Sequence, residues 1–422
     1  MSSTRGSGAR RLAGVAVAIG TASVAGFALL ALIGRMLSPS AFGLFVAFWG
    51  ILFGLGSSLS TLEQETARRT ASGIEESGPS MPAVTTVSAL FAVLVAAATL
   101  LPPIASRLYG SADSRIGLVV ALAAVGFAVQ FTVRGVLMGS DSLLAYSGLV
   151  VAEAVARLAL LLAIAASIGV TLSTAAISVA VGSFAWLGWF GHARAVLPQI
   201  RIHRAEWARA SRRAASLMVA AALNASVVTG YPTMVGALTT HTGGGARGAV
   251  FAALTVSRVP LLLVSPIQAL TVPAVVRWRY AADSGGPSRL RRLLVVGTLA
   301  FCALGIIGAT IGWLWGPWVV HLVYGQAYDV APFAVALLVL SACLLAWVLL
   351  LSATLIALSA HGPMIVMWIV AVAGTAAWLV VSPQGVVETT AIGALVGPLA
   401  ALAWALPSLW SLTRPQARAE QD

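Results

Sequence analysis

Long stretches of apolar, uncharged residues recur along almost the whole chain, and they constrain its fold more than any other feature. A helix that crosses the hydrocarbon core of a bilayer needs about 20 such residues. The 422-residue sequence offers twelve runs close to that length. The predicted spans are 12–33, 41–60, 83–106, 116–138, 143–168, 172–192, 214–240, 248–276, 292–320, 330–358, 363–382 and 386–412. We therefore predict an all-α integral membrane protein with about 12 transmembrane helices.

The composition supports this prediction and excludes other classes of protein. Hydrophobic residues make up 59% of the chain and charged residues 9%, whereas soluble domains carry about 25% charged residues. A soluble enzyme, a disordered chain and a fibrous repeat are all excluded by these proportions.

The basic residues predict the orientation of the chain in the membrane. All 25 are arginines. With a cytoplasmic N-terminus, eighteen fall in inner segments and four in outer segments, while Arg134, Arg157 and Arg258 fall within predicted spans. Because arginine is enriched on the cytoplasmic side, we predict that both termini are cytoplasmic and that the chain is a multi-pass protein of the cell (inner or plasma) membrane.

A long arginine-rich inner segment divides the spans into two sets of six. We predict an N-terminal six-helix bundle over 1–192, a cytoplasmic basic linker over 193–213, a C-terminal six-helix bundle over 214–412 and a cytoplasmic tail over 413–422. The end of the linker, RIHRAEWARASRR (201–213), is typical of a short interfacial helix. It is either a positive-inside anchor or a mobile hinge between the two halves.

The sequence lacks the signals of an enzyme, a metal site or a cofactor site. The outer loops are short, and their acidic residues, Asp113, Asp329 and Glu388, are scattered over three loops. The two cysteines lie in apolar runs, the five histidines lack metal-ligand spacing, and no Walker motif is present. We therefore expect no catalysis, no metal and no cofactor. We expect contact with membrane lipids and none with nucleic acid.

Four local motifs carry a resemblance to a known family. They are GRMLSPSAFGLFVAFWG (34–50), VRGVLMGSDSLLAYSGLVVAEAVARLALLL (133–162), GARGAVFAALTVSRVPLLLVSPIQALTVPAV (245–275) and ATLIALSAHG (353–362). In their order and placement they resemble the polysaccharide-transporter branch of the multidrug/oligosaccharidyl-lipid/polysaccharide (MOP) flippase superfamily. The resemblance implies two six-helix bundles around a central cavity, alternating access without ATP hydrolysis, and a lipid-linked glycan moved from the inner to the outer leaflet.

A carboxylate and an arginine in the fifth span are the first candidate site residues. Glu153 and Arg157 are four residues apart, so they share a helix face and can pair. Glu153 lies about 15 Å from the start of the span, near the middle of the bilayer. One interpretation is a self-neutralising ion pair that faces protein. In the other, Glu153 takes up a coupling proton and frees Arg157 to meet an anionic substrate.

Arg258 is the second candidate, because it lies about ten residues into the eighth predicted span with no acidic residue near it in sequence. A buried charge of this kind needs a distant partner, a water-filled lumen or a ligand. A guanidinium group forms bidentate bonds with a diphosphate. We predict substrate contact, and pairing with Glu153 is the alternative.

Other residues of the spans are weaker candidates for substrate binding. Snorkelling to the headgroups is the favoured interpretation of Arg134. Arg35 belongs either to an outer gate or to the outer headgroup region. Asn224 and Gln268 suggest polar, lumen-facing helices, and helix–helix packing is the alternative.

Prolines in the eighth span predict a hinge. Pro260 and Pro266 each remove a backbone donor and can kink the helix. Kinked backbone at membrane depth is tolerated beside protein or a wet cavity.

Taken together, these features predict a flippase for a lipid-linked oligosaccharide of the polyprenyl-diphosphate type, used in cell-surface polysaccharide biosynthesis. Two alternatives remain: a cation-coupled multidrug exporter of the same superfamily, and a non-transporting membrane scaffold of a glycan-assembly complex. Enzymes of glycan assembly are expected partners in the first and last cases.

Overall fold

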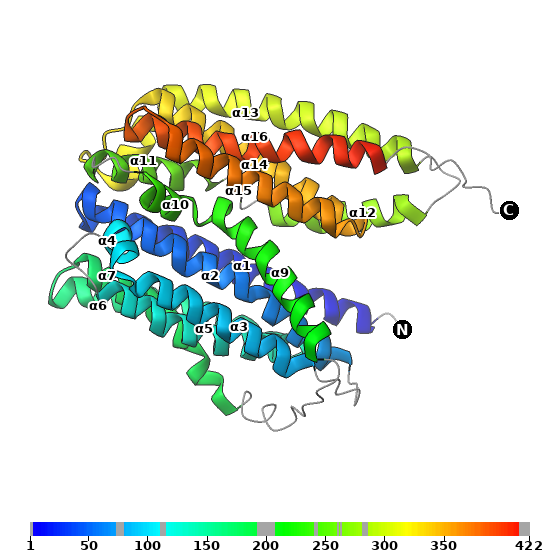
Figure 1. Cartoon of the computed structure of the whole chain (residues 1–422). Helices are drawn as coiled ribbons and strands as arrows, with labels where there is room; N and C mark the ends of the chain where they lie inside the picture. The colour runs from blue at the N-terminus through cyan, green and yellow to red at the C-terminus, as the bar shows by residue number, and fades with distance from the viewer. Residues whose placement is uncertain are drawn as a thin grey trace. The chain divides into compact units, whose positions relative to one another are not determined.

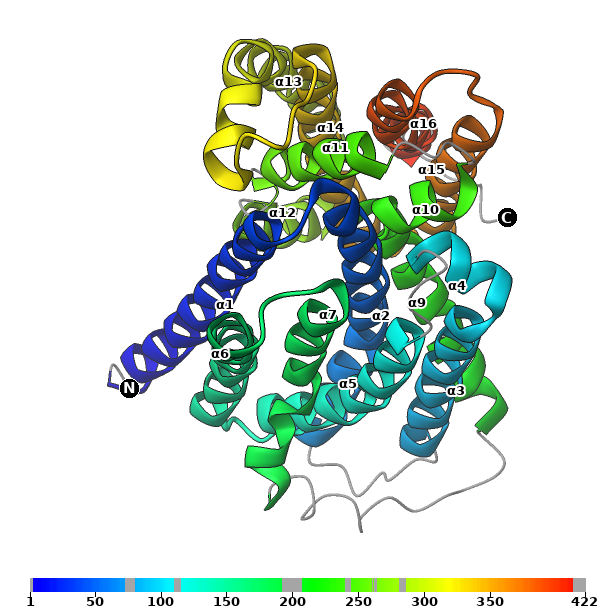
Figure 2. The ribbon, with the colours of Figure 1, turned by 90° about the vertical axis from the view of Figure 1, so that its left-hand side faces the viewer.

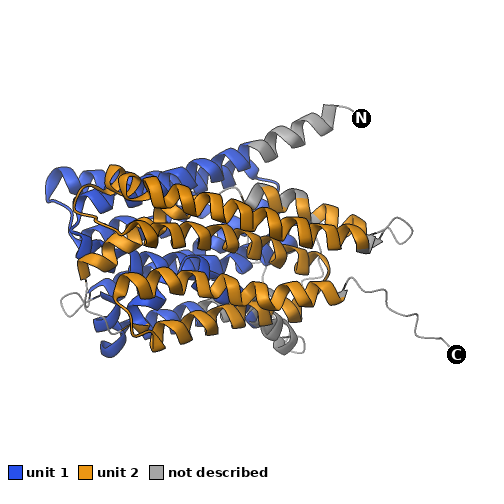
Figure 3. Ribbon diagram, turned by 90° about the horizontal axis from the view of Figure 1, so that it is seen from above, with its two compact units in different colours: residues 1–237 blue, residues 238–422 orange. Residues whose placement is uncertain are grey.

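The computed structural model describes residues 3–72, 80–109, 115–191, 207–239, 244–259, 261, 264–280 and 286–412 (Figure 1). These residues form helices joined by turns, and no strand occurs among them. The predicted all-α fold is confirmed. By their contacts, residues 1–237 form one compact unit (unit 1) and residues 238–422 a second (unit 2), coloured separately in Figure 3.

Unit 1 contains nine α-helices and one 3-10 helix within its described ranges. They are α1 (Ser3–Met36), α2 (Pro39–Ser72), α3 (Ser80–Leu100), α4 (Pro102–Tyr109), α5 (Arg115–Gly139), α6 (Leu143–Ser167), α7 (Leu172–Ala180), the 3-10 helix η1 (Val181–Trp189), α9 (Trp207–Val228) and α10 (Tyr231–Leu238), whose last residue falls in unit 2. Helix α2 packs against α5, α7 and α9, while α1 packs against α6 (Figure 2).

Small residues set the spacing of α2 and α5. A Cβ atom added at Gly135 of α5 would lie 2.6 Å from the backbone oxygen of Glu63 and 2.5 Å from Cβ of Thr66, both in α2. Glycine therefore lets the two backbones come close, as at many helix contacts in membranes. This close approach brings the polar residues of α2 next to those of α5.

A tight turn then places α6 beside α5. The turn runs over 140–142, and Asp141 adopts a left-handed conformation (φ 56°) that Asp and Asn tolerate better than most residues. The backbone N–H of Ser142 donates to Leu137 O. The side chains of α5 and α6 can therefore meet across the helix pair.

Unit 2 contains α11 (Gly244–Ser257), α12 (Val264–Tyr280), α13 (Gly286–Tyr324), α14 (Pro332–Ala357), α15 (His361–Val381) and α16 (Val386–Leu412). Helix α14 is the buried centre of this unit and packs against α11, α12, α13 and α16. Pro332 starts α14 at a position where a missing N–H costs nothing.

The predicted spans agree with the structure in most places but not all. Within the described ranges, nine helices are long and apolar enough to cross a membrane, and eleven spans result if each bent helix pair counts as one. The bent pairs are α3 with α4, at 78°, and α9 with α10, at 79°. A count of twelve is not confirmed.

The eighth predicted span, 248–276, is the one that fails. Helix α11 ends at Ser257 and α12 begins at Val264, so neither helix is long enough to span. The break between the two helices falls at 258–263.

The predicted division into six and six spans stays a prediction. The linker over 193–213 lies outside the described residues as far as 206, and α9 begins at Trp207. Helix α9, which the sequence assigns to the second bundle, packs against α2 and α3 of unit 1. The predicted tail over 413–422 lies outside the described residues.

Candidate functional site

Buried charged residues of α2, α5 and α6 meet inside unit 1, and we call Glu63, Gln130, Arg134, Tyr146, Glu153 and Arg157 the buried charge cluster. Glu153 and Arg157 are each 7% exposed. A guanidinium nitrogen of Arg157 donates to Glu153 Oε1, so the predicted pair one helical turn apart is confirmed.

Several further contacts hold Arg157 in place. Its Nε donates to the backbone oxygen of Val179 at 3.1 Å. Its guanidinium carbon lies 4.9 Å from the ring centre of Phe53 and 6.0 Å from that of Phe127. A Cβ atom added at Gly182 of η1 would overlap the Arg157 side chain. These groups together hold the Arg157 side chain within the protein interior.

Arg134 turns toward the protein interior, and the prediction that it snorkels to the headgroups is wrong. Its side chain is 14% exposed, and one guanidinium nitrogen lies 3.4 Å from Glu153 Oε2. The same group lies over the rings of Phe131 and Tyr146, at 5.4 and 5.8 Å. The carboxylate of Glu153 attracts this arginine more strongly than a distant headgroup can, since Coulomb energy falls with distance and with solvent screening.

Gln130 completes the bonding of Glu153. This residue is fully buried, and its Nε2 donates to Glu153 Oε2 at 2.8 Å. Its Oε1 has no hydrogen-bond partner among the described residues. Glu153 therefore accepts hydrogen bonds from Arg157 of its own helix and from Gln130 of α5, and it forms an ion pair with Arg134 of α5.

Glu63 is a site residue that sequence reasoning missed. It is 8% exposed, and the hydroxyl of Tyr146 donates to its Oε1 at 2.8 Å. The second predicted span ended at residue 60, which placed Glu63 in an inner loop, whereas α2 continues to Ser72. An acidic residue just past a predicted span end was the available signal.

The charges of the cluster compensate one another. When all four groups are ionised, the two carboxylates balance the two guanidinium groups. Removing one partner of a buried ion pair costs free energy, because it leaves an uncompensated charge in a medium of low dielectric constant. A proton taken up by either carboxylate would therefore leave a net positive charge inside unit 1, which favours an anion nearby or a rearrangement of the helices.

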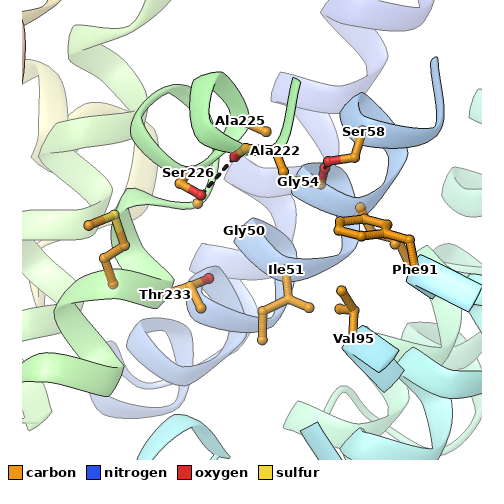
Figure 4. A pocket seen from close by; sticks show the side chains of 13 residues that line it. Gly50, Ile51, Gly54, Ser58, Phe91, Val95, Ala222, Ala225, Ser226 and Thr233 are labelled. Atoms are coloured by element: carbon orange, nitrogen blue, oxygen red, sulfur yellow. Dashed lines mark hydrogen bonds between the residues drawn. The ribbon is translucent and has the colours of Figure 1, made fainter. Parts of the chain in front are cut away.

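A cavity of about 190 Å³ lies on the other side of α2 from the cluster, between α2, α3, α9 and α10 (Figure 4). No charged side chain lines it. The hydroxyl groups of Ser58, Ser226 and Thr233 each donate to a backbone oxygen at 2.8–3.0 Å. Because its polar groups are already bonded, this cavity suits an apolar group. Asn224 is half-buried on α9 and does not line the cavity.

The remaining candidates lie apart from the cluster. Arg258 directly follows the end of α11 in unit 2 and is half-buried. The expectation that Arg258 lies near the middle of the bilayer stays a prediction. Gln268 of α12 donates to Leu349 O at 2.9 Å, which is a contact between helices of unit 2. Arg35 is exposed in the last turn of α1. The convergence of Arg258 with Glu153 stays a prediction.

Of the two prolines predicted to form a hinge, the structure describes only Pro266. Pro260 lies outside the described residues. Pro266 is the third residue of α12, where the backbone N–H has no partner within the helix and proline is tolerated. Pro266 therefore does not kink the middle of a helix, and the interruption lies before it.

No group of three or more His, Cys, Asp or Glu residues that could hold a metal ion occurs in the parts of the chain that the structure describes. Cys302 and Cys343 are free thiols, half-buried and buried respectively.

Comparison with known proteins identifies the fold. No protein-family model matches the chain. An uncharacterized protein of Mycobacterium tuberculosis is 28% identical over 422 residues, covering 94% of this chain and 90% of that protein. An uncharacterized protein of Mycobacterium bovis is 26% identical over 408 residues, covering 94% and 92%.

Among solved structures, an inward-facing multidrug resistance MATE family transporter of the MOP superfamily superimposes with a TM-score of 0.70, covering 94% of this chain and 96% of that one at 14% identity. The chain has the fold of a MATE transporter. A MOP superfamily transporter from Pyrococcus furiosus (TM-score 0.58, 12% identity, 95% of both chains) and a eukaryotic MATE transporter (TM-score 0.56, 14% identity, 96% and 99%) share this fold. With its apolar helices, the MATE fold makes this chain a multi-pass membrane protein.

Proposed function

We propose that the chain is an exporter that moves a lipid-linked oligosaccharide of the polyprenyl-diphosphate type from the cytoplasmic to the outer leaflet by alternating access. It would work without catalysis, in the cell membrane with both termini cytoplasmic, and serve cell-surface polysaccharide biosynthesis. The observation that carries the transport part is the likeness to a MATE transporter over 94% of the chain.

The choice of an anionic substrate is supported by the arginines within the membrane region. Arg134 and Arg157 lie in the buried charge cluster, and Arg258 lies at the end of α11. A buried arginine suits a diphosphate because its planar fork donates two parallel bonds. A site for cationic drugs would instead need an excess of carboxylates.

The buried charge cluster offers a way to couple transport to protons. Protonation of Glu153 would remove the charge that holds Arg134 and Arg157, and those groups would then attract an anion. Glu63 offers a second carboxylate for the same step. A metal cation is a poorer fit at Glu153, because two guanidinium groups already occupy its oxygens and repel a further positive charge.

A multidrug exporter is the second candidate, because the most similar fold described above belongs to a multidrug resistance transporter. The charge of the transported substrate distinguishes the flippase from the multidrug exporter. Reconstituted vesicles that translocate a fluorescent polyprenyl-diphosphate oligosaccharide but not a cationic dye support the flippase, and the reverse result supports drug export.

A deletion strain tests the function in the cell. We expect a lipid-linked sugar to accumulate in the inner leaflet and surface glycan to fall. Arg258→Ala and, less strongly, Arg157→Ala should fail to restore export at normal protein level. Normal surface glycan with Arg258→Ala would refute substrate contact by that residue. Full complementation by variants that translocate nothing in vesicles would instead indicate a scaffold.

A further inference from the structure

A 3-10 helix of nine residues, η1 (Val181–Trp189), directly continues α7 in unit 1 and packs with it against α5 and α6 (Figure 2). Stretches of 3-10 helix longer than three or four residues are uncommon, because their hydrogen bonds have poorer geometry than those of an α-helix. The sequence VGSFAWLGW contains no proline, and glycine is tolerated in an α-helix at a modest cost. The covalent chain therefore does not impose the 3-10 form, and contacts in the folded protein must favour it.

The change of helix type falls where Arg157 meets the segment. An α-helix bonds each N–H to the carbonyl four residues earlier, and a 3-10 helix to the carbonyl three residues earlier. In a continuous α-helix, Val179 O would therefore accept from the N–H of Ser183. Here it accepts from Arg157 Nε at 3.1 Å, and the N–H of Val181 is shared between Ile177 O and Val179 O. The side chain of Arg157 thus binds the acceptor that the next α-helical turn would use.

Arg157 also occupies the space beside the backbone at this point. A Cβ atom added at Gly182 would overlap the Arg157 side chain. On another side, a Cβ atom added at Gly126 of α5 would lie 2.5 Å from Oγ of the fully buried Ser183. A 3-10 helix is tighter than an α-helix, with 3.0 instead of 3.6 residues per turn. The wider α-helix would therefore enter the space that Arg157 fills.

The far part of η1 contains a polar group that this arrangement does not satisfy. Trp186 and Trp189 pack against the core around Tyr146. The indole N–H of Trp186 is buried and has no hydrogen-bond partner among the described residues. A buried donor without a partner costs free energy. The 3-10 form of η1 therefore leaves two features unfavourable, its own hydrogen-bond geometry and this indole.

We propose that Arg157 selects the helix type of residues 181–189. While its side chain binds Glu153 and Val179 O, these residues form a 3-10 helix; when it moves away, Val179 O accepts from the N–H of Ser183 and the segment rewinds into an α-helix. The event that releases Arg157 rests on the proposed function, whereas the change of helix type rests on the geometry of α7 and η1 alone.

The size of the change follows from helix geometry. The rise falls from about 2.0 to about 1.5 Å per residue, so complete rewinding of the nine residues shortens the segment by about 4.5 Å. Each rewound residue also turns the rest of the segment by about 20°, which moves the Trp186 indole out of its unbonded position. A change of charge at Glu153 would thus move the end of the segment at 190–191.

Distances between spin labels test the change of helix type. Ile177→Cys and Phe190→Cys place one label on each side of 181–189, at positions that are 46% and 49% exposed. The background carries Cys302→Ala and Cys343→Ala, so that no other thiol is labelled. Pulsed electron paramagnetic resonance then measures the distance between the labels in the full chain, reconstituted in vesicles without substrate.

Two variants remove Arg157 Nε from Val179 O without unbalancing the charges. Arg157→Lys keeps the positive charge but has a methylene group in place of Nε, and the double variant Glu153→Gln with Arg157→Met removes both charges. Arg134→Gln is the matched control. Arg134 also pairs with Glu153, but no hydrogen bond joins it to α7 or η1 among the described residues.

We expect the distance between labels at 177 and 190 to shorten in both variants by about 2–4.5 Å, the value for four to nine rewound residues. Arg134→Gln should keep the wild-type distance. A second pair of labels, Val155→Cys with Ser167→Cys, lies within α6 and should show no change in any variant. The proposal is overturned by an unchanged distance in both variants, by equal shortening in Arg134→Gln, or by an equal change within α6.

Transport measured in the same vesicles separates this proposal from the proposed function. The probe is a fluorescent polyprenyl-diphosphate oligosaccharide. Shortening in a protein that translocates nothing would refute export and support the change of helix type. Translocation by a protein whose label distance stays the same in both variants would support export and refute the change of helix type.

Discussion

Gly182→Ala is a sensitive test of how Arg157 is held in the buried charge cluster. Gly182 lies in η1, and a Cβ atom there would overlap the side chain that bonds Glu153 and Val179 O. The added methyl group must displace either η1 or the guanidinium group. Adding a methyl group to a well-packed interior costs about 1–3 kcal/mol.

Gly188→Ala is the matched control, because it lies in the same helix and nothing lies within 4 Å of its added Cβ. Both variants lose the backbone freedom of glycine, which stabilises a helical position by up to about 1 kcal/mol. That gain is common to the two, so their difference isolates the overlap. We expect Gly182→Ala to be less stable than Gly188→Ala by about 1–3 kcal/mol.

The assay is reversible unfolding in mixed micelles, with the free energy of unfolding measured for the wild type and both variants. A second comparison repeats Gly182→Ala on an Arg157→Lys background, where the narrower side chain leaves room for the methyl group. The penalty should then shrink, since residues in contact are not additive. Equal stability of the two alanine variants, or an unchanged penalty on the lysine background, would refute the account of how Arg157 is packed.

Two further predictions concern the other groups of the cluster. Tyr146→Phe removes the hydroxyl that donates to Glu63 Oε1 and should lower the free energy of unfolding by about 1–3 kcal/mol, measured in the same micelles; no loss would mean that Glu63 finds another donor. Arg157→Met should destabilise the chain by about 3–5 kcal/mol, because it leaves Glu153 charged and without one of its partners. The double variant Glu153→Gln with Arg157→Met should recover part of that loss in stability. A double variant less stable than Arg157→Met would contradict this view of the pair.

Part of the candidate site could be predicted from the sequence because it is local. Glu153 and Arg157 are four residues apart on one helix, so helical geometry alone brings them together. Arg134 was misinterpreted because its partner lies on the next helix, where sequence spacing carries no information about distance. Gln130, neutral and in the middle of a span, gave no signal beyond its polarity.

The errors in the predicted helix boundaries have a different cause. Hydropathy is an average over many residues, so it does not show where a helix begins or ends. The eighth span was predicted because the segment is apolar over its whole length, yet α11 ends at Ser257. The predicted end of α2 is too early because Glu63 and its polar neighbours lower the local hydropathy, although the helix continues through them and buries Glu63 and Thr66. The apolarity of a segment indicates that it lies in the membrane. Backbone hydrogen bonding determines whether that segment forms one continuous helix.

Helix α2 connects the two features of unit 1 that offer a function. One face of it, through Ile51, Gly54 and Ser58, lines the 190 Å³ cavity. The opposite face carries Phe53, which lies under the Arg157 guanidinium, and Glu63, which binds Tyr146. A helix moves as a stiff rod over these few turns, so a change of charge that shifts one face must shift the other. Proton uptake in the cluster would therefore reshape an apolar cavity that contains no charge of its own, and this is how a charged site and an apolar site on one helix can act as a coupled pair.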